Sequence, residues 1–270
     1  AATSFNRRQR RLLALGVVHG CLIYFGDILT LYAITAWSVW STVHVRWPVV
    51  WRRLKHAVIG ALLAVGGTLL LAWVMPETWS PGTAPTLRGT DELNAFAALN
   101  ASVYATSTAV ALVLALPVVR LCMLAGIVAA RLGLLTRRRW QPWRDVAIRR
   151  LAVPALAANV AYGSTVAMAM SRSGHHVFWA DAVSPVVGLA LAAWYALVLS
   201  SRWHRGQRRW AHVLAPLGAR SLSVYIGASL LCVALFSGVG LARNPGTPVV
   251  ALAAVVLWIV LAWAAALSRR

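Results

Sequence analysis

The chain has 270 residues and a formal net charge of +20, with 26 Lys and Arg against only six Asp and Glu. It is 60% hydrophobic and 12% charged, and residues 249–267 contain no charge over about 20 residues, enough for a helix to cross about 30 Å of hydrocarbon. The basic residues fall in short clusters between apolar stretches, whereas nucleic-acid binding would gather them on one soluble face. The composition excludes a soluble nucleic-acid-binding protein and predicts an all-α, polytopic integral membrane protein.

We expect about eight transmembrane helices in one bundle, forming a single transmembrane domain over residues 1–270. This count places most arginines on one side of the membrane, and that side is expected to be cytoplasmic and to hold both ends of the given chain. Residues 76–100, rich in Pro, Gly and Thr, are predicted to form an extracytoplasmic loop, and residues 94–104 could form an interfacial helix before the fourth span. The predicted spans are 12–25, 28–45, 57–75, 105–130, 150–170, 181–200, 217–240 and 249–267.

The first two predicted spans are separated only by Gly26 and Asp27. A single span over 12–45 would place the basic cluster of residues 46–55 outside and misalign every later loop, so we predict a hairpin turn at Gly26 and Asp27. The first arm has about 14 apolar residues, roughly 21 Å of helix, which is shorter than the hydrocarbon core. Either snorkelling arginines extend it, or the turn lies below the outer surface and Asp27 lines a water-filled pocket.

His19 lies inside the first predicted span, and two interpretations of it remain open. A neutral histidine can join helices for roughly 1 kcal/mol, and Gly16 and Gly20 flank it at a spacing that lets another helix approach closely. Alternatively, His19 is a general base or a proton relay, because the pKa of imidazole lies near neutrality. Asp27 would lie about 12 Å further along a continuous helix, so we expect the two side chains to stay apart unless the turn folds back.

Arg120 is a second charge within a predicted span, three residues after Pro117. An arginine at the centre of a membrane helix costs about 3 kcal/mol, so it should face a cavity, another helix or an anionic ligand. If the span ends earlier, the side chain only snorkels to the interface. Further polar side chains that could line the same interior, or only join helices, are Asn159, Ser164, Thr165, Ser221, Ser223, Tyr225 and Ser229.

No motif in the chain predicts a metal site or a bound cofactor. Walker, dinucleotide-binding, HExxH and CxxC patterns are all missing from the sequence. His175 and His176 are adjacent, so their side chains diverge on a helix or strand and we expect no shared metal. The cysteines lie within predicted spans, which favours small buried hydrophobic residues over a disulfide framework; they are Cys21, Cys122 and Cys232.

Two segments of the chain carry ordered motifs. The first, RRQRRLLALGVVHGCLIYFGDILTLYA, has a basic run, a GxxHxxxxxxGDIL-like segment and a tyrosine, with the motif residues Gly16, His19, Gly26, Asp27, Ile28, Leu29 and Tyr32. The second is APLGARSLSVYIGASLL, with the motif residues Gly218, Ser221, Leu222, Ser223, Tyr225 and Ser229. Both segments resemble those of the YeiB-like family of bacterial inner-membrane proteins, a family of unknown function.

This chain also departs from the family pattern. Many members have an arginine, an asparagine and a glutamine where this chain has Ala219, Val224 and Ala228, and Arg220 is displaced by one position, about 100° around a helix. The family's two preceding helices and its usual C-terminal tail are not in the sequence given. We therefore expect the sequence to be a piece of a protein with about ten helices.

The resemblance implies a distant relationship to transmembrane acyltransferases, including the heparan glucosaminide acetyltransferase and acyltransferase-three groups. Such proteins move an acyl group from cytoplasmic acyl-coenzyme A to an acceptor across the membrane, here an envelope glycan or lipid. In that scheme His19 is the base and Asp27 orients it or contacts the acceptor. Arg120, Arg220, Tyr225 and Ser229 are candidate substrate or anion contacts, and Arg137, Arg138 and Arg139 either attract the donor's phosphates or only set the topology.

Two other classes of function remain open, so enzymatic activity is not decided. A transporter or permease would use His19, Asp27 and Arg120 as a proton or solute path, although no internal repeat of the usual kind is evident. A non-catalytic membrane partner would use them only to pack helices. A cavity at His19 that reaches both faces favours transfer, a narrow polar path favours transport, and close packing around His19 opposes both.

Overall fold

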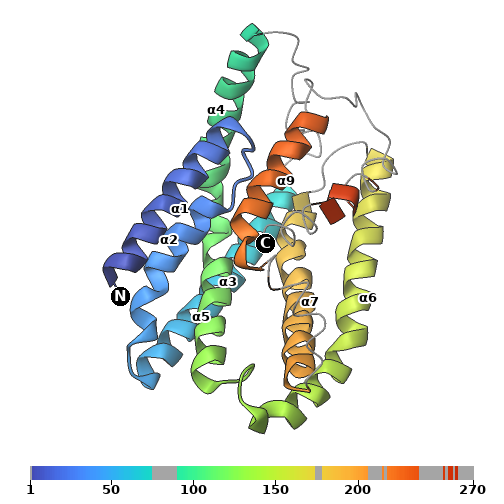
Figure 1. The fold of residues 1–270 in the computed structure, drawn as a ribbon. Helices are drawn as coiled ribbons and strands as arrows, with labels where there is room; N and C mark the ends of the chain where they lie inside the picture. The colour runs from blue at the N-terminus through green and yellow to red at the C-terminus, as the bar shows by residue number, and fades with distance from the viewer. Residues whose placement is uncertain are drawn as a thin grey trace. The chain divides into compact units, whose positions relative to one another are not determined.

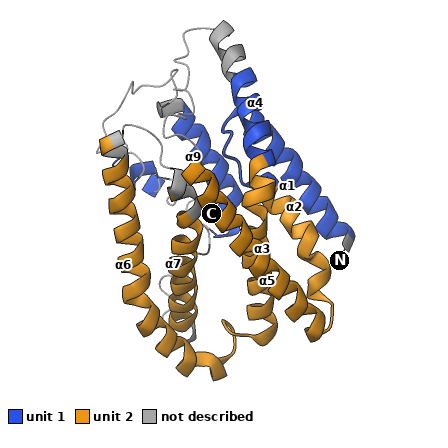
Figure 2. Ribbon diagram, turned by 180° about the vertical axis from the view of Figure 1, so that it is seen from behind, with its two compact units in different colours: residues 1–30, 83–109, 207–270 blue, residues 31–82, 110–206 orange. Residues whose placement is uncertain are grey.

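The computed structural model describes residues 2–74, 90–173, 178–205 and 218–236, and also residues 215, 252, 255–257 and 259–260. The regular structure of these residues is helical, which confirms the predicted all-α class (Figure 1). The chain divides into two compact units (Figure 2). Unit 1 comprises residues 1–30, 83–109 and 207–270, and unit 2 comprises residues 31–82 and 110–206.

Unit 1 contains α1 (Ala2–Leu22), most of α4 (Thr90–Leu114) and α9 (Ser221–Phe236). It also contains the first residues of α2 (Leu29–Trp40), whose remainder belongs to unit 2. The basic first half of α1 precedes an apolar second half, and α1 lies beside α4 (Figure 1).

The predicted break between the first two spans is confirmed. The α1 helix ends at Leu22, and α2 begins at Leu29 after a non-helical segment. The Thr30 N–H donates to Asp27 Oδ2 over 3.1 Å, so the aspartate caps the start of α2. The alternative of one continuous span over residues 12–45 is wrong, because the helical hydrogen bonds stop after α1. At the start of α2 the Asp27 side chain, and not a backbone carbonyl, accepts the Thr30 N–H.

Unit 2 contains α3 (Trp47–Val74), α5 (Leu116–Leu132), α6 (Gln141–Ser173) and α7 (Phe178–His204), with short 3₁₀ turns at Ser41–Val43 and Arg138–Trp140. The α3 helix packs against α5 and α7, and α6 packs against α7. Its buried hydrophobic cluster joins α2, α3 and α5 through Val39, Ala57 and Leu124.

Two arginines of unit 2, Arg53 and Arg131, form hydrogen bonds to the segment that connects α2 to α3. Arg53 Nη1 donates to the hydroxyls of Ser41 and Thr42, both over 2.7 Å. Arg131 Nη1 donates to the carbonyl of Val45 over 2.9 Å, and its guanidinium lies 4.5 Å from the centre of the Trp47 ring. These basic residues therefore stabilise the fold in addition to any effect on membrane topology.

Four described helices are long and apolar enough to cross a membrane, within residues 47–74, 97–114, 138–169 and 183–203. The count of eight spans is not confirmed. The α1 helix carries four arginines, α2 has 12 residues, and the apolar part of α9 is also short. The predicted span 249–267 lies largely outside the described residues.

Two predicted boundaries around α4 are wrong. Residues 94–104 are not a separate interfacial helix, and residues 90–100 are not loop, because α4 runs without a break from Thr90 to Leu114. The predicted span 105–130 is divided at Ala115 into α4 and α5. Pro117, the second residue of α5, has no N–H to continue the helical hydrogen bonds, which accounts for a break at this point. Residues 75–89 of the predicted loop lie outside the described residues.

Arg144 holds together the turn between α5 and α6. Its side chain is completely buried, and Nη1 donates to the carbonyls of Leu134 and Arg137 over 2.8 and 3.2 Å. Nη2 donates to Gln141 Oε1 over 2.6 Å. A buried arginine is tolerated here because carbonyl and amide oxygens at the end of one helix and the start of the next accept its protons.

We predict that Arg144→Met lowers the free energy of unfolding by about 2–4 kcal/mol, because the carbonyls would lose a charged donor. Thermal unfolding of the detergent-solubilised protein measures the effect. Arg150→Met is the matched control on the same helix, since Arg150 is exposed and should change the midpoint little. Equal midpoints for the two variants would contradict a structural role for Arg144.

Candidate functional site

His19 and Asp27 form a buried pair in unit 1. His19 Nδ1 lies 3.0 Å from Asp27 Oδ1, and the side chains are 1% and 0% exposed. The pair forms under the condition named from the sequence, a turn that folds back, because α1 ends at Leu22 and the chain then reverses. The rise of a continuous helix therefore does not separate the two residues.

Asp27 accepts hydrogen bonds on both carboxylate oxygens. Oδ1 faces His19 Nδ1 and also lies 3.4 Å from the Tyr225 hydroxyl of α9, while Oδ2 accepts the Thr30 N–H. The Tyr225 ring also lies against the imidazole, with the ring centres 5.2 Å apart and the planes at 44°. Three groups therefore surround the carboxylate and fix its orientation.

The other ring nitrogen of His19 has no hydrogen-bond partner among the described residues, although it is buried. Since Nδ1 faces a carboxylate, the neutral ring carries its proton on Nδ1 and presents the lone pair on Nε2. Buried polar atoms without a partner are uncommon in folded proteins. A role in helix packing alone does not explain the unpartnered Nε2. With Nδ1 held by Asp27, Nε2 is oriented to accept a proton from a ligand.

Glycines permit the close contacts around His19, as the spacing of Gly16 and Gly20 predicted. A Cβ on Gly16 would lie 2.6 Å from Thr30 Oγ1 and 2.8 Å from Asp27 Oδ2. A Cβ on Gly20 would lie 2.1 Å from the Tyr104 ring. Residues 16 and 20 therefore admit the start of α2 and the side of α4 respectively.

Two residues of α4 complete the site, and the sequence analysis had placed them in a loop or interfacial helix. Asn100 Nδ2 donates to the carbonyls of Gly20 and Cys21 over 2.7 and 2.9 Å, and its Oδ1 accepts the Phe25 N–H over 3.2 Å. The Tyr104 hydroxyl lies 2.7 Å from Thr30 Oγ1. Their spacing of four residues, which puts both on one face of a helix, was the available signal.

Four residues were predicted to bind an anion or a substrate. Among them, Tyr225 is the one whose described interactions place it beside His19. Ser229 donates to the carbonyl of Tyr225 within α9, over 3.1 Å. Arg220 directly precedes α9, and its carbonyl accepts the Val224 N–H. Arg120 belongs to unit 2, where its Nε is buried with no hydrogen-bond partner among the described residues. The roles predicted for Arg120, Arg220 and Ser229 stay predictions.

Other polar residues of the predicted spans act within the helices of unit 2. Asn159 Nδ2 donates to the carbonyls of Ala155 and Val187, which joins α6 to α7. Thr165 donates to the carbonyl of Ala161 on its own helix. These contacts agree with a helix-joining role. His175 and His176 lie outside the described residues.

The site is closed in this structure. His19 is 1% exposed and Tyr104 is 5% exposed. We expected close packing around His19 to oppose both acyl transfer and transport, and the burial seen here favours a helix-joining role for this residue. The unpartnered Nε2 of His19 instead favours proton transfer. A ligand would therefore have to displace a neighbouring side chain to reach the imidazole.

The helices and this pair define an all-helical protein with several helices apolar enough to span a membrane, containing a buried histidine–aspartate pair. A family model described as "Protein of unknown function (DUF418)" matches residues 129–270, just over half of the chain. The chain belongs to this family, which supports the resemblance to YeiB-like proteins. The matched region includes Tyr225 but neither His19 nor Asp27. Comparisons with curated proteins and with solved structures gave no significant match.

We predict that Gly20→Ala lowers the free energy of unfolding by about 1–3 kcal/mol, because the new methyl group would overlap the Tyr104 ring. Gly163→Ala is the matched control, since Gly163 lies in a helix, no described atom lies within 4 Å of its Cβ position, and the change should be neutral or slightly stabilising. Thermal unfolding in detergent compares the two. If Gly20→Ala unfolded at the wild-type temperature, the contact between α1 and α4 would be wrong.

Proposed function

We propose that this chain is a membrane-bound acyltransferase in which His19, oriented by Asp27, takes the proton of an acceptor hydroxyl or amine. The observation that carries the proposal is the buried imidazole with Nδ1 on a carboxylate and Nε2 without a partner among the described residues. Membership of the family and the apolar helices support a membrane protein, and the resemblance supplies the reaction class.

The reaction would pass one proton through His19. The acceptor O–H bond breaks as its proton moves to Nε2, and the acceptor oxygen forms a bond to the thioester carbonyl carbon of an acyl-coenzyme A. The carbon–sulfur bond then breaks, and the coenzyme A thiolate takes the proton back from Nε2. This sequence needs a base near neutral pH, which imidazole provides.

Asp27 would fix the tautomer and stabilise the imidazolium that forms during transfer. A carboxylate on Nδ1 performs this task in catalytic triads, where it orients the ring without becoming protonated. Thr30 and Tyr225 hold the carboxylate in position from two other directions. The contact from Tyr225, at 3.4 Å, is the longest of the three.

The donor would approach from the side on which the arginines gather. Arg137, Arg138 and Arg139 are exposed, as a surface that attracts the phosphates of coenzyme A would require. In this proposal the protein is a multi-pass protein of the bacterial inner membrane with both given ends in the cytoplasm, and the acceptor is an envelope glycan or lipid. Arg120, Arg220 and Ser229 are proposed as further contacts to the anionic donor or the acceptor.

A transporter is the second candidate, because the same buried pair could relay protons across the membrane. Carboxylate and histidine chains serve that purpose in pumps and transporters. The near-complete burial of His19 is also what a non-catalytic membrane partner would show. Activity measurements on variants that keep the fold distinguish these three functions.

We predict that His19→Gln lowers acyl transfer or acyl-coenzyme A hydrolysis by about 10²- to 10⁴-fold, since glutamine fills a similar space but cannot accept the proton. The assay uses purified protein in liposomes with radiolabelled acetyl-coenzyme A. His56→Gln, at an exposed position of α3, is the matched control and should retain activity. Turnover unchanged in a folded His19→Gln protein would remove the catalytic role, and proton flux lost without any acyl turnover would indicate a transporter.

We also predict that Asp27→Asn keeps the helix cap but lowers turnover by a comparable factor, because an amide cannot hold the proton on Nδ1 as a carboxylate does. Thermal unfolding should change by less than about 1 kcal/mol, since asparagine caps helices as well as aspartate. The two measurements together separate positioning from folding. A large loss of stability with normal turnover would show that Asp27 acts only on the fold.

A further inference from the structure

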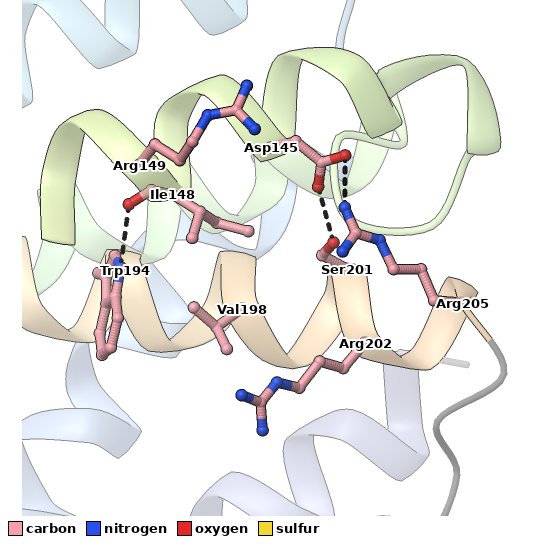
Figure 3. A pocket seen from close by; sticks show the side chains of 8 residues that line it. All are labelled: Asp145, Ile148, Arg149, Trp194, Val198, Ser201, Arg202 and Arg205. Atoms are coloured by element: carbon pink, nitrogen blue, oxygen red, sulfur yellow. Dashed lines mark hydrogen bonds and ion pairs between the residues drawn. The ribbon is translucent and has the colours of Figure 1, made fainter.

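A second site lies between α6 and α7 in unit 2, which run antiparallel. These helices form the walls of an open pocket of about 310 Å³, which lies beside the first turns of α6 and the last turns of α7 (Figure 3). This volume is at the lower end of the range for ligand sites. The lining residues are Asp145, Ile148, Arg149, Trp194, Val198, Ser201, Arg202 and Arg205.

One end of the pocket is closed by a hydrogen-bonded group around Asp145. Arg205 Nη2 lies 2.7 Å from Asp145 Oδ2, and Ser201 Oγ donates to Asp145 Oδ1 over 3.0 Å. Gln141 Nε2 donates to the same carboxylate oxygen over 2.9 Å. Arg205 therefore balances the charge of Asp145, so the other arginines of the pocket give it a net positive charge.

Arg149 and Arg202 supply that charge. Both are exposed, and no hydrogen bond or ion pair joins either side chain to another described residue. Figure 3 shows them extending along opposite margins of the pocket, with Ile148 and Val198 between them. Their guanidinium donors are thus available to a ligand in the pocket or at its rim.

The middle of the pocket is apolar. Trp194 Nε1 donates to the carbonyl of Ile148 over 3.2 Å, so the indole N–H is already used and the ring adds apolar surface. Trp143 and Trp203, both exposed, lie at the same end of the two helices. Tryptophans at this level of a membrane helix mark the boundary between lipid tails and headgroups.

We propose that this pocket binds a phosphate group, which contacts Arg149 or Arg202 at a margin of the pocket beside the apolar surface of Ile148, Val198 and Trp194. The planar guanidinium group matches phosphate oxygens in geometry and charge. A basic pocket between membrane helices at the headgroup level suits an anionic phospholipid, and a soluble phosphate compound carries the same group. The pocket shares no residue with the His19 site, so the two proposals stand independently.

The test compares Arg149→Gln/Arg202→Gln with Arg150→Gln/Arg172→Gln, which removes the same charge from exposed positions of α6 outside the pocket. The whole chain in neutral detergent is titrated with phosphatidylglycerol, phosphatidylcholine or inorganic phosphate. Native mass spectrometry counts bound lipid, and the rise in the thermal midpoint gives the apparent affinity. Unfolding without ligand verifies that both variants fold.

We expect phosphatidylglycerol to bind the wild-type protein and the control variant alike, and to bind the pocket variant roughly tenfold more weakly. If inorganic phosphate shows this dependence on the two arginines, the source of the phosphate is a soluble compound. Binding that is equal in all three proteins, binding of phosphatidylcholine with equal affinity, or no binding of either phosphate source would overturn the proposal.

Discussion

The first helical hairpin is organised by the side chain of Asp27, which accepts a backbone N–H at the start of α2 and meets the side chain of His19. A chain break at the start of a helix leaves backbone N–H groups without acceptors, and an apolar environment makes such groups costly. Asp27 accepts one of them from Thr30, and its other side-chain oxygen, which is also buried, needs hydrogen-bond partners of its own. His19 and Tyr225 are these partners. The side chain of Asp27 therefore caps the start of α2 and also fixes the orientation of the His19 ring.

The same arrangement explains why a structural and a chemical role for His19 do not exclude each other. Nδ1 satisfies the carboxylate, which the fold needs, whereas Nε2 contributes nothing to the described hydrogen bonds. In unit 2 the buried Arg144 instead donates from Nη1 and Nη2 to neutral carbonyl and amide oxygens, while its Nε has no hydrogen-bond partner among the described residues. Buried charge thus organises a helix junction in each unit, with a carboxylate in one and a guanidinium in the other.

Structural features that depend on a few neighbouring residues could be predicted from the sequence. Gly26 and Asp27 indicated the hairpin break, and Gly16 and Gly20 indicated a close helix approach, because both effects act through local backbone and steric requirements. The site residue Asn100 could not be assigned, since its partners Gly20 and Cys21 lie 80 and 79 positions away in the sequence. The division of residues 105–130 at Ala115 was missed because hydropathy continues across it, although Pro117 was visible.

The sequence by itself determined the helical class, the apolar character of the helices and the identity of the polar residues among them. Hydrophobic periodicity and charge distribution suffice for these properties, because each depends on one segment and its solvent. The meeting of His19 with Asp27 was decided only by the tertiary structure. The direction of a turn depends on what holds its ends, and here Asn100 and Tyr104 of α4 hold the end of α1 and the start of α2.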